Sequence, residues 1–331
     1  MKTRLLTSFA LIWAAVFSGQ VQAKTVLYAT TAQDSPSPEL DVTSTPLAGC
    51  GDSDLCDSCG HDSWTLNLLA PSDNCFSGFI SPMTNPVYFE DPRTLTEARF
   101  IYAHHKVPLT AGGGDVDLFA VQIRAAINDR LSIIATKDGY MTSSNPLIDD
   151  GWADINVGLK YNLRKNAHTQ RILSAGATYE LPVGSTRSLQ GNGDGVFNLF
   201  LSGGAQVGSK SHWVSGAGLV LPADSSAESQ WSYWSNHFDT QLGKTKLHPF
   251  IEVNWYHWMK SGDGGINGVE GGDLFNFGST GVAGNDIVTG AIGLKYKPCK
   301  NTEIGVAWEA PMTERRDVLD NRLTLDLILR Y

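Results

Sequence analysis

The sequence predicts an all-β protein: a transmembrane antiparallel β-barrel of about 12 strands that follows a Cys-rich N-terminal extension. Three observations predict this fold class. The last ten residues alternate between polar and apolar, about a dozen earlier runs have strand-like patterns of similar length, and short connections alternate with long ones. Beyond the N-terminal apolar run, no stretch is apolar over the ~20 positions that a transmembrane helix needs.

The final stretch, 322–331, shows the alternation most clearly. Its leucines share one face with the terminal Tyr331, and only Ile328 breaks the pattern. The opposite face carries charges of both signs, namely Arg322, Asp326 and Arg330. A strand of a soluble sandwich can alternate in the same way, but a soluble core would not bury such charges, whereas a water-filled lumen would accept them.

The remaining strands are expected from runs bounded by Gly, Asn, Asp or Pro. Most have roughly the ~9–11 residues that a tilted membrane strand requires. The run near 115–127 changes phase at Phe119, which predicts a β-bulge there, and the phase of 230–242 is ambiguous. We place the strands near 98–108, 115–127, 130–138, 152–163, 170–182, 196–207, 212–222, 230–242, 247–260, 286–297, 302–310 and 322–331.

The connections provide independent support for a barrel. If the first strand starts in the periplasm, the connections after even-numbered strands are short, such as 128–129 and 209–211. Those after odd-numbered strands are mostly longer, above all 261–285. Short periplasmic turns and long extracellular loops are typical of bacterial outer-membrane barrels, so we expect residues 96–331 to form such a barrel in that membrane.

Charged residues on the polar faces of these strands are expected to line the lumen, either as a selective constriction or as partners of a plug. These candidates are Arg99, Asp117, Arg124, Asp154, Lys160, Glu180, Glu252, Lys295, Glu303, Glu309, Arg322, Asp326 and Arg330.

Aromatic residues near the strand ends predict two interfacial girdles, with scattered core aromatics as the alternative. The outer girdle is expected to contain Tyr140, Trp152, Trp231, Trp258 and Trp308, and the inner girdle Tyr161, Tyr296 and Tyr331.

The N-terminal part divides into two segments. Residues 1–23 have the charged start, apolar centre and small-residue cleavage site of a signal peptide. Residues 24–95 form a Cys-rich extension, expected to be periplasmic or plug-like, and from Phe79 onward it is broken by prolines. That part would fit either as a plug in the lumen or as a cap on the barrel mouth.

The five cysteines are Cys50, Cys56, Cys59, Cys75 and Cys299. Because an exported chain folds under oxidising conditions, they are candidates for disulfides, with zinc binding as a weaker alternative. Haem attachment is disfavoured because Gly60 separates Cys59 from His61. Cys299 is expected in a periplasmic turn, either as a free thiol or tied to the extension. We therefore expect no cofactor and no metal.

Several stretches within 80–331 resemble the outer-membrane β-barrels grouped as transporters related to the MetA pathway of phenol degradation. They are ISPMTNP (80–86), FEDPR (89–93), LSIIATKDG (131–139), DGWAD (150–154), AGATYELPVG (175–184), VEGGD (269–273) and the closing strand. The closing strand also resembles the C-terminal signal of outer-membrane barrels, whose last aromatic, here Tyr331, is read by the assembly machinery. The resemblance implies a barrel with a transport role and carries no specific functional residue.

These observations favour a channel or facilitator for small, possibly aromatic or weakly polar solutes. The alternative is a structural or adhesive barrel that presents loop 261–285. An enzyme is disfavoured because no His-x-Ser or Gly-x-Ser-x-Gly pattern marks a nucleophile. The formal charge of -9 argues against nucleic acid as a partner, which leaves outer-membrane lipid, the assembly machinery and a small solute. The sequence does not define the oligomeric state.

Overall fold

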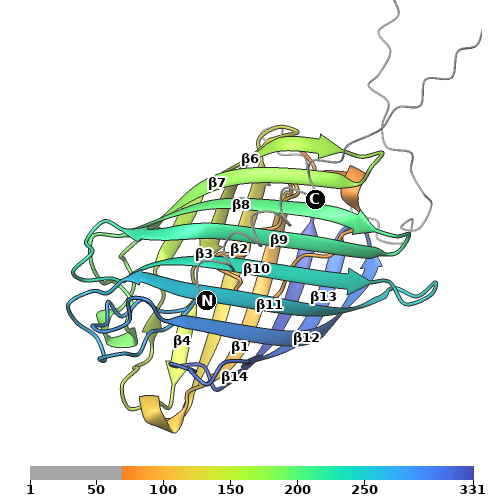
Figure 1. Ribbon diagram of the computed structural model, residues 1–331. Helices are drawn as coiled ribbons and strands as arrows, with labels where there is room; N and C mark the ends of the chain where they lie inside the picture. Colours follow the sequence, from red (N-terminus) through yellow and green to blue (C-terminus); the bar gives the residue numbers. More distant parts are fainter. Residues whose placement is uncertain (1–68) are drawn as a thin grey trace, which may run out of the picture. The chain divides into compact units, whose positions relative to one another are not determined.

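The computed structural model describes residues 69–331, which form one closed antiparallel barrel (Figure 1). A single sheet contains all fourteen strands of this part of the chain, and β1 pairs with both β2 and β14, which closes the wall. The strands are β1 (Glu97–Lys106), β2 (Asp115–Ala126), β3 (Leu131–Lys137), β4 (Tyr140–Ser143), β5 (Gly151–Trp152), β6 (Ile155–Asn166), β7 (Arg171–Leu181), β8 (Val196–Val207), β9 (Ser211–Pro222), β10 (Gln230–Thr240), β11 (Leu247–Lys260), β12 (Asp286–Cys299), β13 (Thr302–Pro311) and β14 (Asn321–Arg330).

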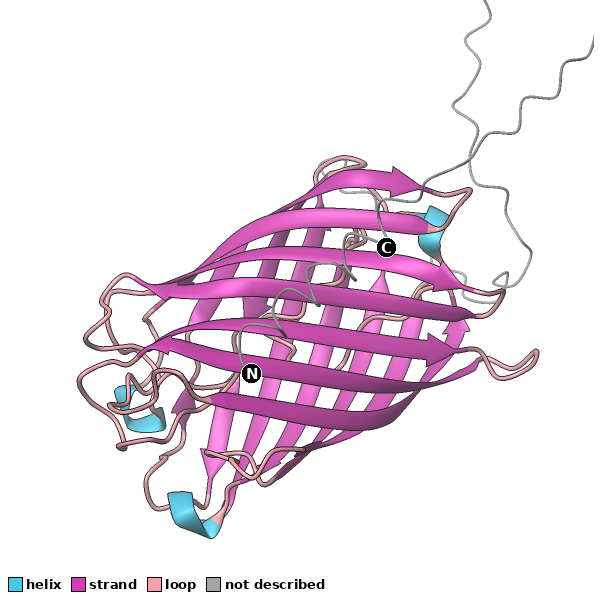
Figure 2. Cartoon of the chain, in the orientation of Figure 1, coloured by secondary structure: helices cyan, strands magenta, loops and turns pink. Residues whose placement is uncertain are grey.

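The fourteen strands correspond to twelve crossings of the wall. β3 and β4 both pair with β2, one with each half; on their other side, β3 pairs with β6 and β4 pairs with β5. β3 and β4 therefore form one interrupted crossing, and β5 and β6 form another. The expected all-β barrel of about 12 strands is confirmed (Figure 2). Closure leaves no edge strand with unpaired backbone groups, as a strand-built wall in lipid requires.

Alternation along the strands separates an apolar outer face from a charged inner face. In β14, exposed leucines alternate with buried polar side chains, as its sequence predicts. The other strands add exposed apolar side chains all round, so the outside forms a lipid-facing band and the protein resides in the bacterial outer membrane. The outward residues include Phe100, Ile123, Leu159, Leu199, Ile251, Ile292, Val306 and Leu325.

The predicted bulge at Phe119 is wrong. β2 keeps one phase throughout, with Val116, Leu118, Gln122 and Arg124 buried. The irregularity lies instead in the neighbouring crossing, where the register between β3 and β6 shifts between Ala135 and Lys137. The inward-facing residues of β2 are apolar near its start (Val116, Leu118) and polar near its end (Gln122, Arg124). In the sequence this change in polarity resembles a change of phase, although inward and outward positions alternate regularly.

The outer aromatic girdle needs a correction too. Trp152 and Trp308 are exposed on the outside, but Trp231 and Trp258 are each only 1% exposed and belong to an apolar cluster in the lumen. β10 carries aromatic residues on both faces, so its hydrophobic pattern does not define the inward face.

The two ends of the barrel differ as the connection lengths predict, and the end with the short turns also holds the C-terminus. At the other end, loop 261–285 turns inward. Leu274, Phe275 and Phe277 are buried there against residues from β1, β2 and β4. This loop narrows the extracellular mouth instead of projecting from it.

The chain before β1 fills the lumen. It starts with η1 (Asn74–Phe76) at the periplasmic end, enters the barrel and returns to that end at β1. Every residue from 79 to 97 is buried. We call residues 76–96 the plug. Residues 1–68, including the expected signal peptide and most of the Cys-rich extension, lie outside the described part of the chain. Among residues 69–331, no helix is long and apolar enough to cross a membrane.

Candidate functional site

The plug folds as an irregular loop because its sequence prevents regular structure. Pro82, Pro86 and Pro92 interrupt both helical and strand hydrogen bonding. At the tip, Asn85 adopts the left-handed conformation with φ 50°, and its carbonyl accepts hydrogen bonds from the amides of Tyr88 and Phe89. Because the plug has no regular backbone hydrogen bonding of its own, its backbone N–H and C=O groups need other hydrogen-bond partners, and here several of these partners are side chains of the barrel wall.

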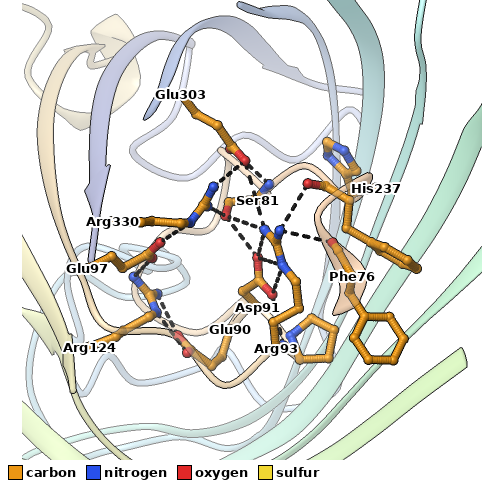
Figure 3. A network of polar contacts seen from close by, with 12 residues as sticks. Phe76, Ser81, Glu90, Asp91, Arg93, Glu97, Arg124, His237, Glu303 and Arg330 are labelled. Carbon is orange, nitrogen blue, oxygen red and sulfur yellow. Dashed lines mark hydrogen bonds and ion pairs between the residues drawn. The ribbon is translucent and has the colours of Figure 1, made fainter. Parts of the chain in front are cut away.

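A chain of alternating charges connects the wall to the plug (Figure 3). Arg330 of β14 bridges Glu303 of β13 at 2.6 Å and Glu97 of β1 at 2.7 Å. Glu97 then pairs with Arg124 of β2 at 3.1 Å, and Arg124 binds both oxygens of the plug residue Glu90, at 2.8 and 2.6 Å. Because all five side chains are buried, the loss of any one leaves an uncompensated charge.

The plug also carries an ion pair of its own. Arg93 binds Asp91 through two nitrogens, at 3.0 and 2.7 Å, and donates to the carbonyl of Phe79 at 3.0 Å. Ser81 donates to Asp91 at 2.8 Å and accepts from the wall residue Arg330 at 2.7 Å. These contacts hold the ascending and descending arms of the plug together and connect both to the wall.

Further wall residues bind the plug backbone. Glu252 of β11 accepts from the amides of Met83 and Thr84, at 2.7 and 2.6 Å. Lys160 of β6 donates to Glu90 and to the carbonyl of Asp91, at 2.7 and 2.6 Å. The plug is therefore held by polar contacts around most of the circumference, and such contacts can be exchanged for water.

A group of histidines lies below the plug tip, and sequence reasoning missed it. His212, His237 and His248 surround Asp239 with nitrogen to oxygen distances of 3.0, 3.4 and 3.6 Å, and His237 also contacts Glu252 at 2.7 Å. In β9, β10 and β11 these histidines occupy the same alternating, inward-facing positions as buried charged residues such as Asp239 and Glu252. This alternation is the sequence signal that identifies them as lumen residues. No set of three or more His, Cys, Asp or Glu within residues 69–331 is arranged to hold a metal ion.

The extracellular half of the lumen has a different character. Tyr88 at the plug tip packs against Trp231 and Tyr233, with ring centroids 4.8 and 5.6 Å apart, and Trp231 contacts Tyr256 at 5.7 Å. Above them, Arg322 pairs with Glu309 at 2.7 Å and with Asp273 of loop 261–285 at 2.9 Å.

On the opposite wall of this upper region, Lys137 pairs with Glu180. Asp154 accepts hydrogen bonds from the amides of Gly184 and Gly191. Its carboxylate therefore stabilises the conformation of loop 182–195.

Of the thirteen residues predicted to line the lumen, twelve have buried side chains on the inner side of the wall. These are Arg99, Arg124, Asp154, Lys160, Glu180, Glu252, Lys295, Glu303, Glu309, Arg322, Asp326 and Arg330.

Asp117 is the exception, and its assignment to the lumen is wrong. Val116 and Leu118 on either side of it are buried, so the pleat turns Asp117 outward. There it accepts hydrogen bonds from Tyr102 at 2.7 Å and from a ring nitrogen of His104 at 2.8 Å, near the extracellular strand ends. A charge on the outer face is tolerated at this level because the polar interface begins there.

A small cavity adjoins the plug in the lumen. A cavity of about 20 Å³ lies between Pro86 and Val87 of the plug, Leu274 of loop 261–285 and the wall around Lys137. This volume suffices for about one water molecule.

The periplasmic end holds the other predicted residues. Tyr331 is 40% exposed, and its amide donates to the carbonyl of Thr96 at 2.9 Å, so its ring is available on the outside. Cys299 is buried at the end of β12, and Cys75 lies in η1. Cys50, Cys56 and Cys59 lie outside the described residues, so the disulfide connectivity stays a prediction.

No model of a protein family matches the chain, and no curated protein matches it either. Solved structures with a similar fold include the COG4313 outer membrane channel from Pseudomonas putida F1, with a TM-score of 0.53 and 12% identity over 76% of this chain and 100% of that one. The KdgM porin is similar at a TM-score of 0.42 and 12% identity, over 70% of this chain and 99% of that one. At these identities the likeness concerns the fold alone, an outer-membrane barrel.

Proposed function

We propose that this protein is an outer-membrane channel for small solutes and that the plug closes it. One observation carries the proposal: a segment of the chain fills the lumen and is bound to the wall by ion pairs and hydrogen bonds, while its apolar side chains are divided among three separate clusters and do not form one continuous core. A barrel of this size can be filled by side chains alone, so a removable segment in its lumen suggests a passage.

The contact between plug and wall supports displacement. Two plug residues form ion pairs with the wall: Glu90 with Arg124 and Lys160, and Arg93 with Glu303. A buried ion pair contributes little net stability compared with apolar packing of the same volume, because desolvation offsets the attraction. If the plug leaves, the wall charges regain water, which limits the cost of breaking the ion pairs; exposing the apolar side chains of the plug adds to the cost of opening.

Small aromatic or weakly polar compounds are the proposed solutes. The resemblance to transporters related to the MetA pathway of phenol degradation supports this class. The aromatic cluster formed by Tyr88, Trp231, Tyr233 and Tyr256 also supports it, because rings along the path can pack against a ring of the solute. The similar fold of the Pseudomonas putida protein, which is described as an outer membrane channel, agrees with a channel.

The alternative, a structural or adhesive barrel that presents loop 261–285, has less support. The largest apolar side chains of that loop turn into the barrel mouth, so they are not offered to a partner outside. We also propose that the chain is not an enzyme, since no nucleophile motif occurs in its sequence.

Planar-bilayer recording tests the channel. In one variant, residues 79–92 are replaced by a Gly/Ser segment of equal length; in a matched control, residues 24–68 are removed and the plug is kept. We expect brief openings from the intact protein and the control, and persistent conductance from the variant without the plug. A plug-replaced barrel that inserts, shifts on gels after boiling and still does not conduct would overturn the proposal.

A further inference from the structure

Glu228 is a buried carboxylate without an ion-pair partner among the described residues. It lies in the loop between β9 and β10, three residues before Trp231, and is 4% exposed. Among the described residues, no hydrogen bond or ion pair reaches its carboxylate, and its Oε2 is fully enclosed. Burying an ionised carboxylate without a partner is costly, so Glu228 is stable there either with a bound proton or with a cationic ligand that balances its charge.

Two neighbouring carboxylates also have an unused oxygen. Glu180 uses Oε1 for Lys137, and Asp273 uses Oδ1 for Arg322, while Oε2 of Glu180 and Oδ2 of Asp273 are buried without a hydrogen-bond partner. Arg322 is shared with Glu309, so it does not fully compensate Asp273. The upper lumen therefore holds more negative than positive charge.

These carboxylates surround an aromatic surface. Glu180, Glu228 and Asp273 are all close enough to Tyr88 to act on its hydroxyl electrostatically. Tyr88 in turn stacks edge-on against Trp231. Aromatic faces attract cations, and unpaired carboxylates nearby add to that attraction. A cation with an apolar or aromatic body would satisfy both features.

We propose that the upper lumen contains a binding subsite for small organic cations, formed by Glu228 with Glu180, Asp273 and the aromatic cluster around Tyr88. The proposal rests on the proposed channel function and narrows its solute class to amines that carry an aromatic or apolar group. The 20 Å³ cavity beside the plug is lined by Lys137 and Leu274 but by none of the subsite residues, so the proposal requires loop 261–285 to move outward when a solute enters.

Protonation supports the assignment and supplies a second observable. Burial, followed by the nearby carboxylate of Glu180, raises the pKa of Glu228 to about 8. The empty site is therefore mostly protonated at neutral pH, and a bound cation takes the place of that proton. The other charged groups around Glu228 are Lys137, Asp154 and Asp224.

Isothermal titration calorimetry of the intact protein tests the subsite with benzylammonium, benzyl alcohol and benzoate near neutral pH. We expect benzylammonium to bind at least about tenfold more tightly than benzyl alcohol, and benzoate not to bind. Titrations in two buffers of different ionisation enthalpy should show that a proton is released when benzylammonium binds. Glu228→Gln should remove both the preference and the proton release. It should fold, because an amide replaces a carboxylate that has no partner.

Asp263→Asn is the matched control, since it removes an exposed carboxylate from loop 261–285 and should change neither result. Equal binding of benzylammonium and benzyl alcohol, absence of binding by all three probes, or an equal effect of both variants would overturn the subsite. If the plug-replaced barrel conducts but benzylammonium does not bind, the channel stands and the subsite is wrong. If benzylammonium binds to a barrel that never conducts, the channel is wrong and the subsite stands.

Discussion

The periplasmic and extracellular halves of the lumen are built differently although the same strands line both. In the periplasmic half, Glu90, Asp91, Glu97 and Glu303 each have at least one cationic partner within about 3 Å. In the extracellular half, aromatic rings replace much of the charge and Glu228 has no partner among the described residues. Buried polar atoms without a hydrogen-bond partner occur in both halves, but a buried carboxylate with neither an ion pair nor a hydrogen bond is found among residues 69–331 only in the extracellular half, at Glu228.

This difference separates two tasks. A network in which each charge is compensated holds one arrangement, since moving any member costs desolvation without a new partner. A region of ring faces and unpaired acceptors can exchange contacts with a solute at little cost. The periplasmic half therefore holds the plug, and the extracellular half is suited to contact what passes.

The largest effect is expected from breaking the charge chain. Arg330→Ala leaves Glu97 and Glu303 short of a partner and should destabilise the folded protein by ~3–5 kcal/mol. The measurement is the temperature at which the barrel loses its compact migration on SDS gels. Arg187→Ala is the control: its pair with Asp149 is exposed, so its loss should cost ~0–1 kcal/mol. Equal shifts for both variants would mean that the buried chain does not hold the periplasmic half together.

A smaller effect is expected on the lipid face, which both halves share. Leu325→Arg puts a cation among lipid chains and should cost ~2–4 kcal/mol near the midplane, seen as reduced insertion into liposomes. Leu109→Arg changes a side chain that is 92% exposed in the first extracellular connection and should insert normally. Normal insertion of Leu325→Arg would contradict the assignment of faces in β14.

The sequence predicts the barrel better than it predicts the lumen. Every strand repeats the alternation of polar and apolar residues, and the connections between strands alternate in length. Twelve crossings and two different barrel ends follow from these two patterns. Which side chains meet across the lumen depends on the plug, whose path no periodicity encodes. For this reason Glu303 and Arg330 are assignable to the inner face, while their common contact with Ser81 is not predictable.

The errors have a physical cause as well. Near the ends of the strands the inside and outside are similar in polarity, so a charge such as Asp117 can face outward and a large ring such as Trp231 can face inward. His212, His237 and His248 were missed because they lie on three different strands and approach one another only when the sheet closes.

The smallest effect concerns pH and is expected in the loops of the extracellular half. Burial raises the pKa of Glu228 to about 8 and that of Asp317 to about 6, so the folded loops bind protons more tightly than the unfolded chain does. Their stability should fall as pH rises through that range. Hydrogen exchange in residues 261–285, corrected for its intrinsic rate, should therefore accelerate several-fold between about pH 5 and pH 8.

Two comparisons sharpen this prediction. Glu228→Gln should flatten the slope in the loop, while Asp263→Asn, which removes an exposed carboxylate, should leave the slope unchanged. An equal effect of both variants would mean that Glu228 does not set the pH dependence of the loop.

The most direct test of the central claim is to lock the plug in place. The Asn85 amide at the plug tip donates to the hydroxyl of Ser235 on β10 at 3.0 Å, so the two side chains meet, and cysteines at both positions are the pair to oxidise, with the disulfide verified by non-reducing peptide mapping before recording. In bilayer recordings the oxidised double variant should show no openings, and a reductant should restore the brief openings of the intact protein, with each single variant unaffected. Openings that continue at the same frequency while the disulfide is intact would contradict a channel closed by its plug.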